Sequence, residues 1–395
     1  MGKARRVAIV GAGLGGLAAA IALRQQGIEV QVYEQAPELG EFGAGINISP
    51  NSAKFFDAIG LAAKLQAVGS EPIGLTWRDW GADEISYSLP FGDFQKRYGA
   101  KYYVVHRSDL HRLLSETVPQ ESIQLGKRCK QVETRNGSAG LLFDDGSSAE
   151  ADVVVGCDGI RSAVRASTFG GEGPHYAGTM CWRALAPTDA LPENCHDGYV
   201  NQWSGDGGFV VSYYIRQGKF INFVCVRQQP GWTEQSWSVP SNVDEMLAAF
   251  PNAGKKLRTM MAAATSCSKW GQFTGEHAPK WTKGRVTLLG DSAHAMLATF
   301  GQGANMAFED AYVLSRWLAS SDDPDAALAG YEAVRKPRAT RVQQLSRTEV
   351  GFKKIHTDWD RLRREFAFVT RHGSTTGGVY RWIFGYDPVA QWRGS

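Results

Sequence analysis

The glycine-rich segment GAGLGG at residues 11–16 restricts the possible folds of this chain more than any other feature. It follows the apolar run RRVAIV, opens a helix-like stretch over 14–26, and precedes the alternating run EVQVYE at 29–34. A buried strand, a glycine turn, a helix and a second strand in this order predict a βαβ unit. Such a unit presents free backbone N–H groups at the helix N-terminus, where they can bind a phosphate. The pattern therefore predicts a dinucleotide site near the start of the chain.

The glycines of this segment fit the G-x-G-x-x-G pattern, and each has a physical reason. Gly11 permits the tight turn, Gly13 lets the backbone approach a pyrophosphate, and Gly16 lets the helix pack on the strand. Glu34 ends the second strand, where a carboxylate can accept hydrogen bonds from both ribose hydroxyls. This favours an unphosphorylated ribose, which FAD and NAD share. The alternative is a glycine-rich packing turn with an unrelated surface glutamate.

A second glycine-rich segment, GDSAHAMLATFGQGAN, follows the buried run RVTLLG at 285–290. Asp291 stands at the end of that strand, where a carboxylate can bind the hydroxyls of a ribityl chain. Gly301, Gly303 and Asn305 let the backbone come close to a flat ligand, and the following helix directs its positive end toward it. Two such sites predict one long ligand, FAD, bound at both ends. The alternative is a helix capped by Asn305 after an incidental Gly-Asp.

A third segment, VVVGCDGIRSAVR at 153–165, again places an Asp-Gly turn between a strand and a helix. We expect Asp158 to face the same cleft, and Arg161 and Arg165 to approach phosphate. On its own this segment gives weak support, because Asp-Gly after a strand is ordinary turn chemistry.

Composition limits the remaining alternatives. The chain has 395 residues, of which 43% are apolar and 21% charged, as in ordinary globular proteins. A net charge of +3 is too small to indicate nucleic acid or an anionic membrane as a partner. Six cysteines without CxxC spacing argue against a metal site or a disulfide framework and fit a reducing cytoplasm. The basic and apolar start resembles a signal peptide, but its glycines fit a strand, turn and helix better.

The apolar pattern predicts an α/β fold in which an antiparallel-sheet domain interrupts an FAD-binding Rossmann-like domain. Short alternating runs rich in tryptophan and tyrosine dominate the middle of the chain, between buried parallel-type strands. The predicted parts are an FAD-binding domain over 1–174, a substrate-binding β-sheet domain over 175–274, the return of the FAD-binding domain over 275–320, and a helical C-terminal region over 321–395. The predicted shorter elements are a helix from Pro50 to about Ile59, a hairpin over 73–89, a strand over 102–106, a helix capped by Ser108, and a meander over 128–150.

The three loops, in this order and spacing, resemble those of the class A flavoprotein aromatic hydroxylases. The segments FGAGINISPN, HRSDLHRLL and WIFGYD strengthen the resemblance, which covers nearly the whole chain. They are most similar to the branch that holds salicylate hydroxylase, 3-hydroxybenzoate 6-hydroxylase and 6-hydroxynicotinate 3-monooxygenase. The resemblance implies non-covalent FAD, reduction by NADH or NADPH, and a flavin C4a-hydroperoxide that hydroxylates an activated aromatic or heteroaromatic carboxylic acid. With O₂ and that acid as partners, we expect a cytoplasmic monomer or homodimer that binds no nucleic acid, membrane or metal.

The resemblance also implies roles for individual residues. Those on the AMP half of FAD would be Leu14, Gly15, Glu34 and Gln35. Those toward the ribityl chain and the flavin ring would be Arg107, Asp291, Gly303, Ala304 and Asn305. The backbone at Cys129 would lie near adenine, and Asp158 would serve both FAD and a transiently bound nicotinamide.

Three positions depart from the pattern of the resembled family. Ala298 stands where most members have a proline close to the flavin. Phe209 stands where members that act on hydroxybenzoate often have a histidine, and Asn47 where the 6-hydroxynicotinate branch has one. These departures leave the substrate open.

The run GFVVSYYI predicts a strand whose period of two puts Phe209, Val211 and Tyr213 on one face. We expect this face to cover the substrate, with Tyr213 and Asn47 as candidate catalytic residues. Phe209, Val211 and Ala298 are then candidate pocket residues. The alternative is a tyrosine that only packs. Two other functions also remain open: a flavin-dependent reductase or dehydrogenase on the same scaffold, and a non-enzymatic flavin-binding redox module.

Overall fold

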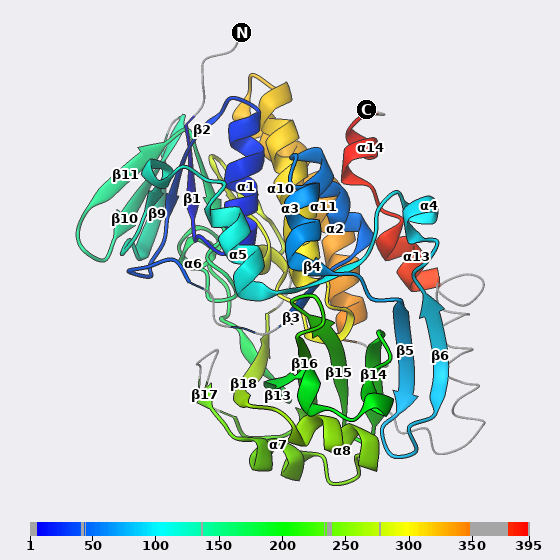
Figure 1. Cartoon of the computed structure of the whole chain (residues 1–395). Helices are drawn as coiled ribbons and strands as arrows, with labels where there is room; N and C mark the ends of the chain where they lie inside the picture. Colours follow the sequence, from blue (N-terminus) through cyan, green and yellow to red (C-terminus); the bar gives the residue numbers. More distant parts are fainter. Residues whose placement is uncertain are drawn as a thin grey trace.

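The computed structural model describes residues 6–40, 43, 45–135, 137–232, 234, 239–275, 278–347 and 378–393. Figure 1 shows helices and a parallel sheet in the upper half of the molecule and a broad, mostly antiparallel sheet in the lower half. Within the described part of the chain, no helix combines the length and the apolar character that crossing a bilayer requires.

The upper half is built on a six-stranded sheet that is parallel except at β19. In spatial order its strands are β19 (Thr282–Lys283), β20 (Val286–Leu288), β12 (Val153–Gly156), β1 (Arg6–Val10), β2 (Glu29–Tyr33) and β8 (Ile123–Gln124). β1 pairs in parallel with β12 and β2, and β12 pairs in parallel with β20. This arrangement confirms the predicted βαβ unit and the predicted return of the chain to the first sheet.

Two layers cover this sheet. α1 (Leu14–Gln25) and α10 (Gly303–Ser320) pack along one another on one side. A three-stranded sheet lies on the other side, at the left of Figure 1, with β11 (Ser148–Ala151), β10 (Ser138–Phe143) and β9 (Cys129–Arg135) in spatial order. It is the predicted meander. Because both faces are covered, β12 is buried along its whole length.

The remaining helices surround this core. They are α2 (Pro50–Ala58), α3 (Ala62–Val68), α4 (Phe94–Tyr98), α5 (Arg107–Ser115), α6 (Ala163–Phe169), α9 (Asp291–His294), α11 (Pro324–Ser346), α13 (Gly378–Phe384) and α14 (Pro388–Arg393). The short 3₁₀ turns are η1 (Gln120–Ser122), η2 (Thr188–Ala190), η3 (Glu193–Cys195) and η4 (Ala298–Phe300). The predicted C-terminal helices are therefore present in the described residues, and the part over 348–377 lies outside them.

The expectation that Ser108 caps a helix is wrong. α5 already begins at Arg107, and its N-cap is His106. The His106 Nδ1 atom accepts a hydrogen bond from the Ser108 backbone N–H at 3.3 Å. An imidazole thus replaces the hydroxyl that usually caps a helix N-terminus.

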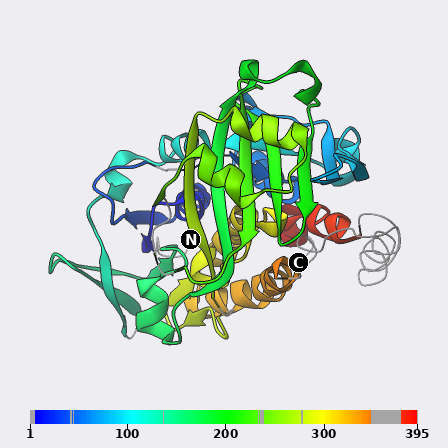
Figure 2. The same cartoon turned by 90° about the horizontal axis from the view of Figure 1, so that it is seen from below.

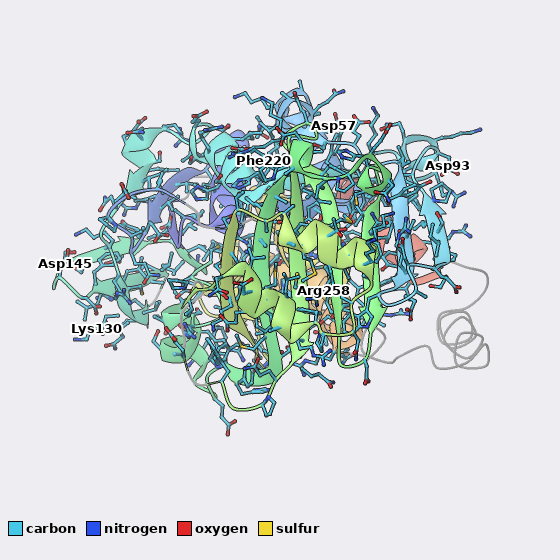
Figure 3. The ribbon with its side chains drawn as sticks, turned by 60° about the horizontal axis from the view of Figure 1, so that its bottom comes forward. Asp57, Asp93, Lys130, Asp145, Phe220 and Arg258 are labelled. Carbon is cyan, nitrogen blue, oxygen red and sulfur yellow. The ribbon has the colours of Figure 1, made fainter. Side chains whose placement is uncertain are left out.

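The lower half is an eight-stranded sheet. In spatial order its strands are β17 (Val239–Pro240), β18 (Ser266–Thr274), β13 (His175–Pro187), β16 (Phe220–Gln228), β15 (Gly208–Ile215), β14 (Val200–Gly205), β5 (Gly74–Asp79) and β6 (Ile85–Pro90). Seen from below, α7 (Val243–Ala249) and α8 (Lys255–Ala262) lie across its outer face (Figure 2). Figure 3 shows Arg258 of α8 on this outer side.

The predicted hairpin over 73–89 forms β5 and β6, which belong to this lower sheet although they precede residue 174. β14 pairs in parallel with β5, with Val200 beside Leu75. The two halves of the molecule are therefore interleaved along the chain. The domain boundaries given above stay a prediction.

A small sheet connects the halves. It consists of β3 (Gly45–Ile48), β7 (Tyr103–His106) and β4 (Gly69–Ser70), with β7 in the middle. The Gly45 N–H donates a hydrogen bond to Asn222 Oδ1 of β16 at 2.7 Å, and Arg216 Nε donates to Asp109 Oδ2 at 2.8 Å. The first contact places β3 against the eight-stranded sheet, and the second joins α5 to the turn between β15 and β16.

Candidate active site

The glycine loop of the first βαβ unit has no space for side chains at two of its positions. Gly11 has a φ of +103°, and a Cβ atom there would lie 2.5 Å from the Cys157 carbonyl oxygen. A Cβ atom on Gly16 would lie 1.9 Å from the Gly11 carbonyl oxygen. Gly13 is the N-cap of α1, so the loop ends with backbone N–H groups at a helix N-terminus. This is the cradle that a pyrophosphate requires.

Glu34 closes this loop from the side. Its Oε2 accepts a hydrogen bond from the Ala12 N–H at 2.7 Å, and its Oε1 accepts one from the Ala36 N–H at 2.8 Å. Each carboxylate oxygen keeps a lone pair that can accept from a hydroxyl. Gln35, next to it, is exposed, whereas Leu14 is buried at the start of α1.

Two further predicted residues lie near this loop. Asp158 accepts hydrogen bonds from Ser162 Oγ at 2.5 Å and from the Val164 N–H at 3.1 Å, so its carboxylate organises the turn before α6. Burial raises the pKa of Asp158, although these hydrogen bonds lower it. Burial also raises the pKa of the Cys129 thiol to about 12, so the thiol remains protonated and unreactive at neutral pH.

Gly15 brings the two glycine-rich segments together. A Cβ atom on Gly15 would lie 3.1 Å from the Leu289 side chain and 3.2 Å from Ala307 Cβ, so α1 approaches both β20 and α10 closely. The first and second predicted loops are therefore neighbours in space.

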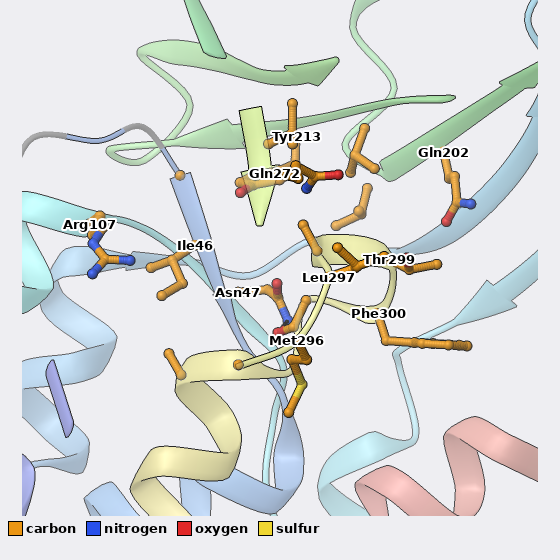
Figure 4. Close-up of a pocket in the computed structure, with 18 of the residues that line it drawn as sticks. Ile46, Asn47, Arg107, Gln202, Tyr213, Gln272, Met296, Leu297, Thr299 and Phe300 are labelled. Atoms are coloured by element: carbon orange, nitrogen blue, oxygen red, sulfur yellow. Dashed lines mark hydrogen bonds between the residues drawn. The ribbon is translucent and has the colours of Figure 1, made fainter. Parts of the chain in front are cut away.

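A cavity of about 240 Å³ lies between the second loop and the eight-stranded sheet (Figure 4). On one side it is bordered by the second loop, namely Asp291, Ala295–Gly301, Gly303 and Ala304. Gly45–Asn47 of β3 lie beside this loop. The eight-stranded sheet lies opposite and contributes Val211, Tyr213 and Gln272. Figure 4 shows Arg107 at one end and Gln202 at the other, with Tyr213 and Gln272 opposite Leu297. The cavity thus joins the predicted flavin side to the predicted substrate side.

Asp291 borders this cavity with an exposed side chain, although protein surrounds it on its other sides. Desolvation raises its pKa, while the nearby His294 and Arg107 lower it. Gly303 and Ala304, in the first turn of α10, border the same cavity. A carboxylate, a guanidinium and the positive end of an 18-residue helix therefore converge there.

Asn305 does not border the cavity through its side chain, which is fully buried. Its Nδ2 donates to the Gly301 carbonyl at 2.8 Å and to the Asn47 carbonyl at 3.0 Å, and its Oδ1 accepts from the Ser49 N–H at 3.0 Å. Asn47 does border the cavity, and its Nδ2 donates to the same Gly301 carbonyl at 3.0 Å. The two amides therefore fix the loop before α10 against β3.

The alternation of β15 agrees with the prediction from the sequence. Val211 and Tyr213 face the cavity, whereas Ser212 accepts a hydrogen bond from Trp203 Nε1 and Tyr214 donates one to the Cys195 carbonyl on the outer side. Phe209 shares the inner face but lies beyond the cavity. It packs with Cys181, Val226 and Trp270. Ala298 borders the cavity.

The Tyr213 hydroxyl is turned toward the cavity, and no other described residue hydrogen-bonds it. Burial raises its pKa well above the usual value, and Arg183 lowers it only in part. The phenol is therefore neutral at physiological pH, so it can donate one hydrogen bond and accept another.

Several polar residues of the cavity were not predicted. They are Arg183 of β13, Gln202 of β14 and Gln272 of β18. The Arg183 guanidinium lies 4.4 Å from the centre of the Trp270 ring. Gln272 Oε1 accepts from Thr179 Oγ1 at 2.9 Å, which leaves its N–H₂ group to donate. Arg183 and Gln272 reach the cavity through the long-range pairing of β13 with β16 and β18, and Gln202 through the register of the β14–β15 hairpin. The sequence shows neither.

These observations fit FAD. The first loop excludes side chains where a pyrophosphate would lie, Glu34 offers acceptors for a ribose, and Asp291 stands at the cavity where a ribityl chain would pass. The close packing of Gly15 against Leu289 and Ala307 makes the two loops neighbours, so one long ligand could contact both.

Comparison with known proteins agrees with this site. The family described as "FAD binding domain" matches residues 4–346. The chain is 37% identical to a 3-amino-4-hydroxybenzoate 2-monooxygenase of Streptomyces platensis over 97% of this chain and 96% of that protein. It is 36% identical to a 6-hydroxynicotinate 3-monooxygenase of Pseudomonas fluorescens, over 88% and 91%. Among solved structures, a salicylate hydroxylase substrate complex superposes with a TM-score of 0.84 at 27% identity, over 99% and 97%.

The fold, the two loops and these relatives define an FAD-dependent aromatic-ring monooxygenase. The chain belongs to the class A flavoprotein aromatic hydroxylases. The predicted fold class, FAD as cofactor with a nicotinamide reductant, and the enzymatic activity are thereby confirmed. The reductase and the redox module that the sequence left open are set aside.

Proposed function

We propose that this enzyme hydroxylates a hydroxy- or amino-substituted aromatic carboxylic acid, with FAD, O₂ and NADH or NADPH. The observation that carries the proposal is the neutral Tyr213 hydroxyl, which faces a largely apolar cavity without a partner among the described residues. Relatives named for 3-amino-4-hydroxybenzoate and for 6-hydroxynicotinate support this class of substrate.

The cavity residues have distinct roles in this proposal. Tyr213 accepts a hydrogen bond from the phenol or amine of the ring, which increases the electron density of the ring, and its own proton can be donated to a carboxylate. Arg183 lies close enough to Tyr213 to lower its pKa, so it also favours an anionic ligand. Val211, Leu297 and Phe300 exclude water from the ring. No side chain needs to act as a nucleophile.

The flavin side contributes placement and electrostatics. Gly11, Gly13 and Glu34 would hold the AMP half of FAD, and Asp291 with Arg107 would hold the ribityl–phosphate part. FAD, when bound, accepts electrons from the nicotinamide and activates oxygen. The loop fixed by Asn47 and Asn305 keeps the cavity side rigid, so that the substrate ring stays in one position.

A substrate screen tests the proposal. Oxidation of NADH and uptake of O₂ are followed together with a panel of aromatic acids, and the products are identified by mass. Each hydroxy or amino acid is paired with its O-methyl or N,N-dimethyl derivative. We expect stimulated, coupled consumption only with the free hydroxy or amino compounds. Equal stimulation by the blocked derivatives would refute the role of Tyr213, and no stimulation by any aromatic acid would refute the substrate class.

Further assignments belong to the same proposal. Six free cysteines support a reducing, cytoplasmic environment. Asp158 is proposed to serve the nicotinamide as well as the turn before α6. Stopped-flow measurement of flavin reduction and reoxidation separates the two roles, because a purely structural residue slows both half-reactions equally in Asp158→Ala. A monomer or homodimer is expected, which sedimentation can determine.

A further inference from the structure

A short helix near the end of the chain supplies one wall of the cavity. Tyr380 and Phe384 of α13 both border it. Their rings lie 5.3 Å apart, and Tyr380 also lies 5.5 Å from Trp77 of β5 and 5.8 Å from Phe300 of the second loop. Figure 1 shows α13 beside α4 at the edge of the molecule. α13 therefore meets both the flavin side and the substrate side.

α13 has only seven residues, so its own hydrogen bonds cannot keep it helical in isolation. Its position depends on contacts with the longer helices. One polar contact comes from Arg338 of α11, whose Nη2 donates to the Ile383 carbonyl at 3.0 Å. The same guanidinium lies 4.9 Å from the Trp382 ring centre and 3.9 Å from that of Tyr386. One side chain thus holds the backbone and two rings of this segment.

Arg338 is itself fixed by a buried carboxylate. Its Nε and Nη2 donate to Oε2 and Oε1 of Glu309 on α10 at 2.7 and 2.8 Å. Glu309 also accepts from Asn51 Nδ2 at 2.6 Å and pairs with Arg335 at 2.7 Å. Burial alone would raise the pKa of Glu309, but Arg338 and Arg335 hold it below its usual value, so the carboxylate stays charged. A two-point contact of this kind leaves Arg338 little freedom.

The next residue of α10 extends the network to the second loop. Asp310 accepts from His294 Nε2 at 2.6 Å, from Arg335 Nε at 2.7 Å and from the Gly290 N–H at 3.2 Å. Gly290 and His294 flank Asp291. Two adjacent carboxylates of one rigid helix therefore fix the loop that carries Asp291 and, through Arg338, the helix that carries Tyr380 and Phe384.

We propose that Arg338 is a positioning residue for hydroxylation, which ties α13 to α10 and thereby holds Tyr380 and Phe384 as a wall of the substrate cavity. This rests on the proposed function in one respect only, namely that the cavity binds the substrate. Without the guanidinium, the Ile383 carbonyl keeps only the longer hydrogen bond from the Tyr386 N–H at 3.4 Å. Lys54, which donates to the Tyr386 carbonyl at 3.1 Å, remains as a second polar anchor of this segment. The wall then opens to water, while the glycine loop stays unchanged.

The test uses the FAD-loaded, full-length enzyme with the variants Arg338→Met and Arg341→Met. Arg341 is a matched control, because it lies on the same helix with its guanidinium 4.5 Å from the Trp382 ring but is exposed. Amide hydrogen exchange over residues 378–387 and the fraction of NADH lost to hydrogen peroxide are measured in each. In Arg338→Met we expect exchange about tenfold faster, equal to about 1.4 kcal/mol of local stability. We also expect a higher KM for the aromatic acid, more peroxide, and unchanged FAD content.

Wild-type exchange over residues 378–387 in Arg338→Met would overturn the proposal, and so would an equal effect in Arg341→Met. Faster exchange without any change in KM or peroxide would also overturn it, because the anchor would then have no effect on the cavity. If Arg338→Met does not fold, Arg338→Lys decides by the same readouts, since lysine keeps the charge but cannot bind Glu309 and the Ile383 carbonyl together. Amide hydrogen exchange is measured without substrate, so it tests whether Arg338 holds α13 even if the proposed substrate class is wrong.

Discussion

The glycine loop and the roof of the cavity, which is the inner face of the eight-stranded sheet, bind their ligands by different means. In the loop, the binding groups are backbone N–H groups, and the sequence contributes mainly by omitting side chains at Gly11 and Gly16. In the roof, the backbone is committed to the pairing of β15 with β14 and β16, so side chains such as Tyr213 do the binding. Backbone geometry tolerates few substitutions, whereas a roof made of side chains can change its ligand without changing the fold.

The difference explains why the cofactor is easier to assign than the substrate. The cradle for a pyrophosphate is one continuous segment, and its chemistry is the same wherever the motif occurs. The roof collects residues from six strands of the eight-stranded sheet and from a C-terminal helix, and any of them can vary independently. The following predictions test this contrast, beginning with the largest effect.

Gly16→Ala should have the largest effect, because its Cβ would lie 1.9 Å from the Gly11 carbonyl oxygen. The strand and helix must separate, at a cost of about 3 kcal/mol, and the cradle is lost with them. We expect protein without bound FAD, which absorbance at the flavin bands measures directly. Gly92→Ala is the control, since no atom lies within 4 Å of that Cβ position. A yellow Gly16→Ala protein with normal affinity would show that the loop is not the cradle.

Asp291→Asn should weaken FAD binding while the loop geometry stays intact. Replacing a charged acceptor of hydroxyl groups costs about 1.5–3 kcal/mol, and titration of the apoprotein with FAD measures it. Because Asp291 belongs to the flavin side, substrate preference should not change. An altered order of preferred aromatic acids would mean that Asp291 contacts the substrate instead.

The same variant should stabilise the FAD-free protein at neutral pH. Desolvation raises the pKa of Asp291 in the folded state. The free energy of unfolding is therefore greatest below the unfolded-state pKa of about 3.9 and falls as pH rises through the raised pKa. Asparagine does not ionise, so the variant does not lose this stability as pH rises. The Tm of the Asp291→Asn apoprotein should therefore exceed that of the wild-type apoprotein at pH 7 and approach it in acid. A Tm difference that is independent of pH would contradict this explanation.

Tyr213→Phe should have a smaller and more selective effect. The loss of one hydrogen bond to the substrate costs about 0.5–1.5 kcal/mol, so kcat/KM should fall while FAD binding is unchanged. More NADH should be lost to peroxide, because the ring is held less well. Tyr214→Phe is the matched control, since its hydroxyl donates to the Cys195 carbonyl on the outer face at 2.9 Å. If both variants couple as well as the wild type, Tyr213 serves only packing.

Ala298→Pro should have the smallest effect. Ala298 is the first residue of η4, and Leu297 before it has φ −70° and ψ 153°, which a following proline favours. Proline restricts the unfolded chain, so the free energy of unfolding should rise by about 0.4–1 kcal/mol, visible as a slightly higher Tm. A lower Tm would show that the backbone at this position needs its N–H or a different φ.

Local patterns in the sequence predicted the first βαβ unit, both loops and the inward face of β15. Each depends on residues close together in the chain. Phe209 shares that face but does not border the cavity, because it lies four residues before Tyr213, which is about 13 Å along the strand. Arg183 and Gln272 escaped prediction because the pairing of β13 with β16 and β18 is long-range, and Gln202 because the register of the β14–β15 hairpin was not predicted. The N-cap of α5 differed because an imidazole took the place of a hydroxyl.

The interleaving of the two sheets has a consequence for biosynthesis. β12 receives its neighbour β20 only when residues 286–288 have left the ribosome, and β5 must wait for β14 at residues 200–205. Until then, apolar strand edges of both sheets are exposed, which favours aggregation and the recruitment of chaperones. Neither sheet can be completed until a strand from a later part of the chain has been synthesised. The nascent chain therefore completes both sheets, and with them both ligand sites, only late in synthesis.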